Sequence, residues 1–459
     1  MTLLRRDVWS LGTAADPWHP TLEFYALAVR AMQAKPLADP TSWSYQAAIH
    51  GLAGIAPPPG APWNTCQHAT WYFLPWHRMY LYQFEQIVRQ EVAALGGPDD
   101  WALPYWNYEE PDRNQLPPAF AQATLPDGSP NPLLVLARRP GINQGLQLPP
   151  QVTSSAAAMA TTFFTTPSSG TPLGFGGPQT VFAHFGPAPG ALENQPHNIM
   201  HVVIGGPDGL MSNPDTAAED PIFWLHHANI DRLWETWRLN GNANPATIAF
   251  GSRTFRLRTP SGDTVRTRVD QVLDTVADLD YSYDSLPAVA AVPQGSPVKK
   301  RTRTVMVGRS TKAATLGPAG TSVTVPVPDL PPASAAAAEG PAPHIHIELA
   351  DIEGTVNPGV VYGVYVNLPA RPKAQQREAH RVGLVSFFGL EQTAKHGKAA
   401  GEPLRYVFDA TDVVERIRSR GDVSELTVTL EPIEGMGDER AAAAEAPTVS
   451  IGTIAVLTS

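Results

Sequence analysis

Two groups of histidines in the first half of the chain are the residues best suited to do chemistry. The upstream group comprises His50, His68 and His77, and the downstream group comprises His197, His201, His226 and His227. Neutral imidazole is the usual protein ligand for copper and other late first-row metals. Magnesium and calcium prefer oxygen ligands, so sites built from imidazole nitrogen disfavour them. The two groups therefore predict two metal ions, and they favour a pair of coppers that act on oxygen.

The spacing of the downstream histidines indicates which kind of metal site they can form. His197 and His201 are four residues apart, so on a helix they face the same side and can hold one ion. A zinc-protease helix would carry a glutamate directly after its first histidine, whereas Asn198 occupies that position here. His226 and His227 are adjacent, so we expect at most one of them to bind the same ion. Helical periodicity does not choose between the two.

Helical patterns surround both groups of histidines. Helices are predicted over 21–35, 41–53, 75–95, 196–205 and 221–239, and the Pro- and Gly-rich stretch 110–190 is predicted to form long loops. In the third helix His77 shares an apolar stripe with Leu81, Phe84 and Val88, so its ring is expected to point into the core. The region 1–285 is therefore predicted to be a mainly α-helical domain.

The pattern changes after about residue 285. Residues 286–302 are rich in Pro and Ala and contain the basic run 299–301, which is typical of an exposed linker. Further on, apolar and polar residues alternate in 344–349, 361–366, 426–430 and 449–456. Alternation with period two predicts an antiparallel β-sandwich over 303–459. His344 and His346 alternate within one of these strands, where a structural or exposed role is expected.

Composition excludes several classes of protein. Charged residues make up 17% of the 459 residues, and the formal net charge of −10 gives no support for binding to nucleic acid or an anionic membrane. The single cysteine, Cys66, excludes an intrachain disulfide. No apolar run is long enough to span a membrane, and the N-terminus has no recognisable signal peptide. A cytoplasmic location is the expectation, with export together with a partner protein as the alternative.

Four segments resemble the type 3 copper proteins, which comprise the tyrosinases, the catechol oxidases (polyphenol oxidases) and molluscan hemocyanin domains. These segments are 64–81, 103–108, 193–201 and 220–234. The resemblance covers roughly residues 1–285, and the triplet 281–283 is similar to the tyrosine motif that closes the catalytic domain in this family. Residues 364–369 also resemble the C-terminal domain of plant polyphenol oxidases, which would shield the site in this chain.

The resemblance implies a four-helix core around a dicopper site, with three histidines for each ion. The implied ligands are His50, His68 and His77 for the first copper and His197, His201 and His227 for the second. His226 would then lie just outside the ligand set, and Phe223 would pack beside the copper pair. Pro214 matches the place where many relatives carry a bulky gate residue over the second copper, so a smaller gate is expected.

Three further residues gain roles from the resemblance. Glu193 and Asn198 match a pair that holds a water beside the second copper, and this water would accept the proton of a phenol. A helix N-terminus also favours a carboxylate, and Asn198 could be an ordinary residue of the first helical turn, so both roles have a structural alternative. Cys66 matches a cysteine that is linked to the ligand His68 by a thioether, a cross-link that lowers the intact mass by two hydrogens. The alternative is a buried free thiol, which leaves the mass at the encoded value.

The implied activity is the oxidation of o-diphenols to o-quinones with O2, together with ortho-hydroxylation of monophenols. Two copper ions are the cofactor, O2 is the co-substrate, and small phenols are the substrates. A hemocyanin-like oxygen carrier and an o-aminophenol oxidase are the alternatives. The preferred phenol, the ratio of the two activities, the oligomeric state, the need for a copper-delivery partner and the latency of the chain are left open.

Overall fold

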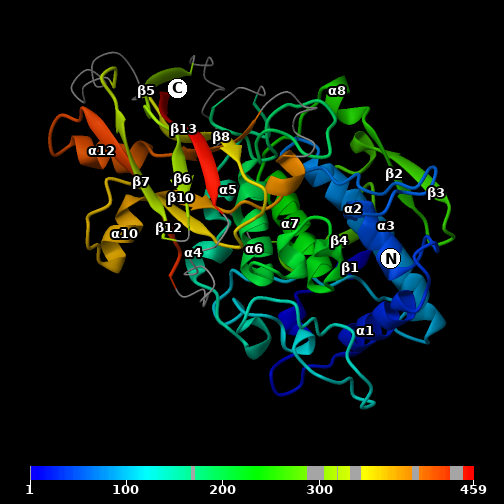
Figure 1. Ribbon diagram of the computed structural model, residues 1–459. Helices are drawn as coiled ribbons and strands as arrows, with labels where there is room; N and C mark the ends of the chain where they lie inside the picture. Colours follow the sequence, from blue (N-terminus) through cyan, green and yellow to red (C-terminus); the bar gives the residue numbers. More distant parts are fainter. Residues whose placement is uncertain are drawn as a thin grey trace.

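The computed structural model describes residues 2–166, 171–286, 304–317, 319–330, 343–394, 403–434 and 448–459. Up to residue 286 the chain forms a helical region, and two β-sheets from the C-terminal part lie against one side of it (Figure 1). The predicted succession of a helical region and a sheet-rich region is confirmed. The expected linker lies outside the described residues, apart from Leu286.

Five helices occupy the predicted segments. They are α1 (Pro20–Gln33), α2 (Trp43–His50), α3 (Phe73–Ala94), α6 (Ile199–Gly205) and α7 (Ile222–Leu239). A π-helical turn, η4 (Glu193–Asn198), leads directly into α6. The predicted helix 41–53 starts two residues before α2 and ends three residues after it, because Gly51 adopts an extended conformation and its N–H donates to the Ala47 carbonyl as a cap. At the other end of α2, the Ser42 side chain caps the helix by accepting a hydrogen bond from the Tyr45 N–H.

The long loops predicted for 110–190 contain only short helical turns, and the other connections of the helical region contain similar turns. They are η1 (Val8–Ser10), η2 (Pro118–Phe120), η3 (Ile142–Gln144), α4 (Pro150–Thr153), α5 (Ala156–Met159), η5 (Leu210–Ser212), η6 (Ala217–Glu219), α8 (Ile248–Gly251) and η7 (Val269–Gln271). Two small strand pairs complete it: β1 (Leu3–Arg5) runs parallel to β4 (Tyr281–Tyr283), and β2 (Thr254–Arg258) forms a hairpin with β3 (Thr264–Arg268). The first pair brings the N-terminus beside the tyrosine motif.

One hydrophobic core joins the helices, and tryptophan dominates it. Trp43 on α2, Trp76 on α3 and Trp224 and Trp234 on α7 are each at most 2% exposed. Residues of the C-terminal part, namely Val361, Leu384, Phe388 and Ile433, belong to this same core. The two regions are therefore packed through apolar side chains. No described helix has the length and apolar character needed to cross a membrane.

The C-terminal part contains two antiparallel sheets, as predicted. One has the order β10 (Arg381–Val385), β9 (Tyr362–Val366), β12 (Glu425–Pro432) and β7 (Thr321–Pro326). The other has the order β11 (Leu404–Asp409), β8 (Ile345–Glu353), β13 (Val449–Thr458) and β5 (Val305–Arg309), and β6 (Ala314–Leu316) also pairs with β13. Two helices, α10 (Ala374–His380) and α12 (Thr411–Arg418), flank the sheets.

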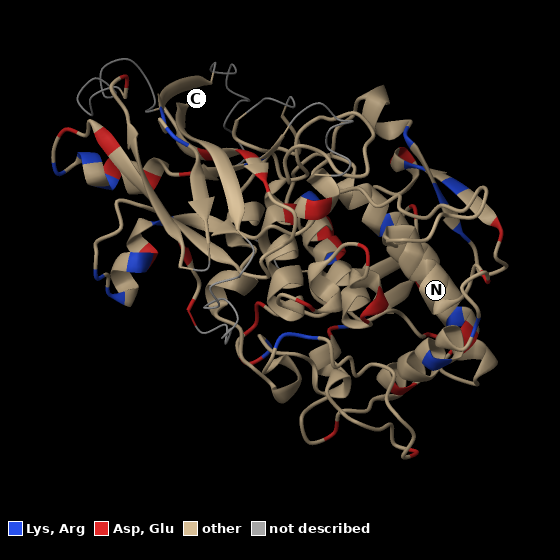
Figure 2. Cartoon of the chain, in the orientation of Figure 1, with Lys and Arg blue, Asp and Glu red and all other residues tan. Residues whose placement is uncertain are grey.

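Alternation along these strands has the predicted consequence. Ile345, Ile347 and Leu349 on β8 are buried in the second hydrophobic core. On the other face of β8, His346 is buried and its Nε2 lies 3.0 Å from Ser459 Oγ, which fits the structural role expected for it. Figure 2 shows acidic and basic residues interspersed along the elements of both regions.

Candidate metal centre

The upstream histidines converge from three different places. His50 is the last residue of α2, His68 lies in the loop before α3, and His77 lies one turn into α3. Their ring centroids are 5.1, 5.3 and 5.6 Å apart, and each residue is at most 3% exposed. His68 is thus the member that no helix carries.

The downstream histidines form a second group beside the first. His197 lies in η4, His201 on α6 and His227 on α7, with ring centroids 4.5, 4.8 and 5.5 Å apart. The rings of His77 and His227 stack with centroids 4.5 Å apart and so join the two groups.

Backbone carbonyls hold several of these rings by one nitrogen and leave the other free. The Nδ1 atoms of His50, His77 and His201 each lie 2.8 Å from a carbonyl oxygen, of Pro214, Phe73 and Met211 respectively. A ring that donates from Nδ1 presents a lone pair on Nε2. Among the described residues, the buried Nε2 atoms of His50, His68 and His77 have no hydrogen-bond partner.

The spacing of the downstream nitrogens fits a metal ion. His227 Nε2 lies 3.3 Å from His197 Nε2 and 3.3 Å from His201 Nε2. Nitrogens about 2.0 Å from a tetrahedral ion stand roughly 3.3 Å apart. Burial lowers the pKa of His50 to about 3 and the pKa values of the other five imidazoles well below the ordinary histidine value, so all are neutral. The donor set is therefore suited to copper.

His226 lies close to the downstream group. His197, His201, His226 and His227 can all bring one ligand atom within 4.8 Å of one another. However, His226 Nδ1 lies 3.3 Å from the Tyr108 hydroxyl, so one nitrogen of this ring already has a polar partner.

Two phenylalanines pack between the groups. Phe223, singled out from the sequence, has its ring 5.0 Å from His50 and 4.2 Å from His227. Phe73, which the sequence analysis missed, lies 4.6 Å from both His77 and His197. Its position one helical turn before His77 is the signal that could have identified it. These apolar rings offer the imidazoles no hydrogen-bond partner on the sides that they cover.

Glu193 and Asn198 both contact histidine-bearing segments. Glu193 Oε1 accepts a hydrogen bond from the Ala69 N–H at 2.6 Å, while its buried Oε2 has no partner in the described part of the chain. Burial raises the pKa of Glu193 to about 8. Asn198 Oδ1 lies 2.8 Å from His197 Nδ1. Both residues line a cavity of about 10 Å³, near the lower limit for one water.

Similarity to known proteins agrees with this geometry. The common central domain of tyrosinase matches residues 40–240, and a domain of unknown function matches residues 303–459. A tyrosinase from Hahella sp. (strain CCB-MM4) is 34% identical over 450 residues, covering 90% of this chain and 92% of that protein. The chain belongs to the tyrosinase family. It is accordingly a copper oxidoreductase acting on phenols, and the two groups of histidines are consistent with the dinuclear copper centre of this family.

A plant relative and a solved plant structure also resemble this chain, and the solved structure shares its fold. The latent chloroplastic polyphenol oxidase of Prunus armeniaca is 28% identical over 429 residues, covering 88% of this chain and 69% of its own. The structure of latent apple tyrosinase superposes with a TM-score of 0.63 at 21% identity, and it covers 100% of this chain and 97% of its own. The fold of a tyrosinase with a sheet-rich C-terminal region is therefore shared.

In this tyrosinase-family chain the C-terminal part reaches the histidines. The ring of Phe388, which lies after β10, stacks on His201 with centroids 4.1 Å apart and planes 19° apart. It also lies 5.6 Å from His68 and 5.8 Å from His197. Phe388 is 6% exposed. No local sequence pattern distinguishes this phenylalanine, because its partners are more than 180 residues away.

Cys66 and Pro214 also adjoin the site. Cys66 Sγ is buried and lies 3.2 Å from His68 Nδ1 and 3.4 Å from His184 Nδ1; sequence reasoning gave His184 no role. Pro214 was expected as a gate over the second copper. Its carbonyl accepts from His50, a member of the upstream group, and the role of its side chain as a gate stays a prediction. The loop that carries Pro214 therefore contacts a histidine of the upstream group through its backbone, which a comparison of side chains does not reveal.

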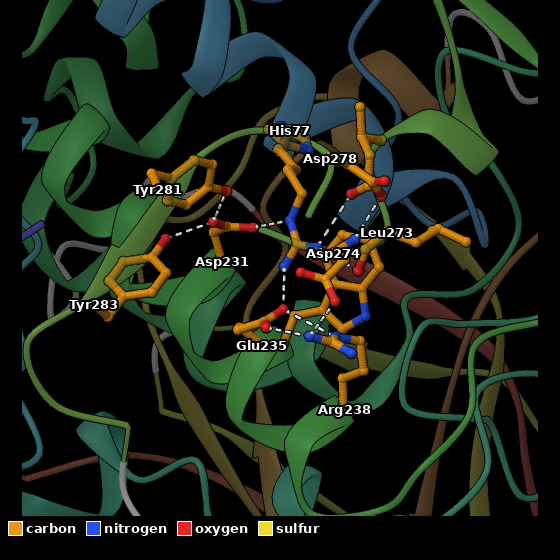
Figure 3. A network of polar contacts seen from close by, with 12 residues as sticks. His77, Asp231, Glu235, Arg238, Leu273, Asp274, Asp278, Tyr281 and Tyr283 are labelled. Carbon is orange, nitrogen blue, oxygen red and sulfur yellow. Dashed lines mark hydrogen bonds and ion pairs between the residues drawn. The ribbon is translucent and has the colours of Figure 1, made fainter. Parts of the chain in front are cut away.

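A buried ionic network fixes the helices that carry His77 and His227. Asp231, one turn after His227, contacts the Arg78 guanidinium, which follows His77 directly, and accepts hydrogen bonds from the Tyr281 and Tyr283 hydroxyls (Figure 3). The tyrosine motif therefore closes the helical region by binding to a charge pair between α3 and α7.

Proposed function

We propose that this chain oxidises o-diphenols to o-quinones with O2 and also hydroxylates monophenols at the ortho position. The single observation that carries the proposal is the pair of adjoining buried groups of imidazoles, joined where His77 stacks on His227 at 4.5 Å. The ligands would be His50, His68 and His77 for the first copper and His197, His201 and His227 for the second. The four helices α2, α3, α6 and α7 would form the core around them.

The protein residues would orient the phenol and receive its proton. When bound, the two coppers would supply the exchange of electrons between O2 and the phenol. A phenol has a pKa near 10, so binding as phenolate needs a base. The free Oε2 of Glu193 and the amide of Asn198 border the same small cavity, where a water held between them would take that proton.

Replacing Glu193 by glutamine should slow monophenol turnover by about 10²-fold or more, with a much smaller effect on diphenol turnover. The substitution keeps the shape of the side chain and removes the carboxyl group that would hold the proton-accepting water, which matters most when a phenol must be deprotonated before hydroxylation. Initial rates with tyrosine and with catechol would measure both effects. Equal losses for the two substrates would refute the assignment.

We also propose the thioether between Cys66 and His68. The support is the 3.2 Å contact of Sγ with the His68 ring and the complete burial of the thiol. Burial raises the pKa of Cys66, so the free thiol would be protonated and a poor nucleophile on its own. The cross-link would fix the ring of the one upstream histidine that lies on a loop. Forming the cross-link would replace the Cys66 S–H bond and a ring C–H bond of His68 by one S–C bond, and O2, the co-substrate of the proposed reaction, would accept the two hydrogens and their electrons. An intact mass two hydrogens below the encoded value would be its direct measure.

The proposed domains are a catalytic domain over 1–285, a linker over 286–302 and a shielding domain over 303–459. The stacking of Phe388 on His201 supports a closed, latent arrangement, because an aromatic ring occupies the space that a phenol would need beside the second copper. Val361, Leu384 and Ile433 pack in the same core as the catalytic helices and would hold this arrangement.

Product analysis would test the proposed function. Copper-loaded chain would be incubated with tyrosine, catechol and o-aminophenol, before and after brief trypsin treatment aimed at the basic run 299–301. We expect o-quinone from catechol, and dopa-derived quinone from tyrosine, with higher rates after cleavage. Reversible O2 binding with no turnover before or after cleavage would favour an oxygen carrier, and turnover of o-aminophenol alone would favour an o-aminophenol oxidase.

A further inference from the structure

One short loop between α6 and α7 supports a histidine from each group. This loop, residues 210–216 and here called the bridging loop, accepts from His201 through the Met211 carbonyl and from His50 through the Pro214 carbonyl, both at 2.8 Å. His50 belongs to the upstream group and His201 to the downstream group. The position of one loop therefore sets the orientation of a ring in each group.

The bridging loop is packed closely against the segments that carry these two histidines. A Cβ added to Gly51, the residue after His50, would lie 2.5 Å from the Pro214 oxygen. A Cβ added to Gly205, at the end of α6, would lie 2.3 Å from the Ser212 nitrogen. Glycine is required at both positions because the backbones touch. A shift of the loop must therefore move the ends of α2 and α6 or break the bonds to the imidazoles.

The C-terminal part of the chain holds the bridging loop from its other side. Gln392 Nε2 donates to Asn213 Oδ1 at 2.9 Å and to Asp215 Oδ2 at 3.0 Å, and Asn357 Nδ2 donates to the Ser212 carbonyl at 3.1 Å. Gln392 is 2% exposed, so its two bonds are shielded from competing water. It lies four residues after Phe388, in the same segment that covers the histidines.

We propose that Gln392 is a positioning residue for copper, acting through the bridging loop on His50 and His201. The C-terminal domain would then retain the ions as well as cover them. The inference rests on the proposed dicopper site. Outer partners of metal ligands commonly change metal affinity by about 10–100-fold, because they fix the tautomer and orientation of the ligand ring and raise its basicity. Gln392 acts one contact further out, through the loop whose carbonyls are those outer partners.

The test uses the full chain with Gln392→Met, which keeps the length of the side chain and removes the donor. Copper-loaded protein would be mixed with a strong chelator, and copper remaining per chain would be followed by metal analysis. We expect release to be about tenfold faster than in the unsubstituted chain, which is the release rate that corresponds to the lower end of the affinity range for outer partners when copper uptake is unchanged. Tyr362→Phe is the matched control, because it removes one buried hydroxyl bond inside the C-terminal domain, to the Gly317 carbonyl, and leaves the bridging loop untouched.

Two further readouts separate positioning from other causes of release. The midpoint of thermal unfolding of the copper-free protein should fall no further for Gln392→Met than for Tyr362→Phe; a larger fall would mean a structural role and overturn the proposal. Catechol turnover by the uncleaved chain should not rise in step with release. A parallel rise would mean that the domain opens, which would also overturn it. Copper release from Gln392→Met at the rate of the unsubstituted chain would overturn the proposal as well.

The outcome also distinguishes this inference from the proposed function. An unsubstituted chain that binds fewer than two coppers would refute the dicopper assignment itself. An unsubstituted chain that binds two coppers and loses them at the same rate as Gln392→Met would refute only the role of Gln392.

Discussion

Replacing His227 by alanine should remove the second copper, whereas replacing His226 should leave both ions bound. His227 Nε2 lies 3.3 Å from the Nε2 atoms of both His197 and His201, the separation expected of three ligands around one ion. Removal of an outer partner costs metal affinity about 10–100-fold, so loss of a direct ligand should cost more than about 100-fold. Phenol turnover should fall with the second ion.

His226→Ala is the matched control for this prediction. The substitution is at the adjacent residue of the same helix, and it removes a ring whose Nδ1 contacts the Tyr108 hydroxyl. Copper content by metal analysis, after dialysis at limiting free copper, would distinguish the two variants. One copper in His226→Ala together with two in His227→Ala would reverse the assignment, since both rings lie within reach of the same group.

The choice between these two histidines shows what the sequence could and could not provide. Helical spacing placed His197 and His201 on one face, and both remain together in the structure. Spacing alone could not separate adjacent residues, and only the resemblance favoured His227. The geometry adds one difference between the two rings: His227 Nε2 lies 3.3 Å from the Nε2 atoms of both His197 and His201, whereas His226 Nδ1 lies 3.3 Å from the Tyr108 hydroxyl.

Residues whose role depends on distant contacts could not be predicted from local patterns. The alternating pattern identified β8 and β13, but it gave no indication that Phe388 would stack on His201. Likewise, the bridging loop reads as an ordinary turn, and its carbonyl bonds to His50 and His201 appear only when α2 and α6 are folded beside it. Periodicity reports which face of an element is buried and says nothing of its partner.

Replacing Asp231 by alanine should lower the free energy of unfolding by about 3–5 kcal/mol, the usual cost of removing one partner from a buried ion pair. Asp231 is 4% exposed and lies within salt-bridge distance of Arg78 and Arg5, at 2.5 and 3.3 Å. Its removal would leave two buried guanidinium groups with less charge to balance them. It would also remove the acceptor of the Tyr281 and Tyr283 hydroxyls, and so loosen the closure of the helical region.

Urea unfolding of the copper-free chain would measure this loss, with Asp270→Asn as the control. Asp270 pairs with Arg268 on the exposed β2–β3 hairpin, where such a pair contributes about 0–1 kcal/mol.

The pH dependence of stability provides a second check. Burial acts to raise the pKa of Asp231, but Arg78, Arg5 and the two tyrosine hydroxyls lower it below its ordinary value. A carboxylate with a lowered folded-state pKa stabilises the protein above its unfolded-state pKa, and this contribution disappears as the pH falls through the folded-state value. The stability difference between the unsubstituted chain and Asp231→Asn should therefore be full at neutral pH and shrink in acid. A difference that stays constant with pH would show that the charge of Asp231 does not hold α3 to α7.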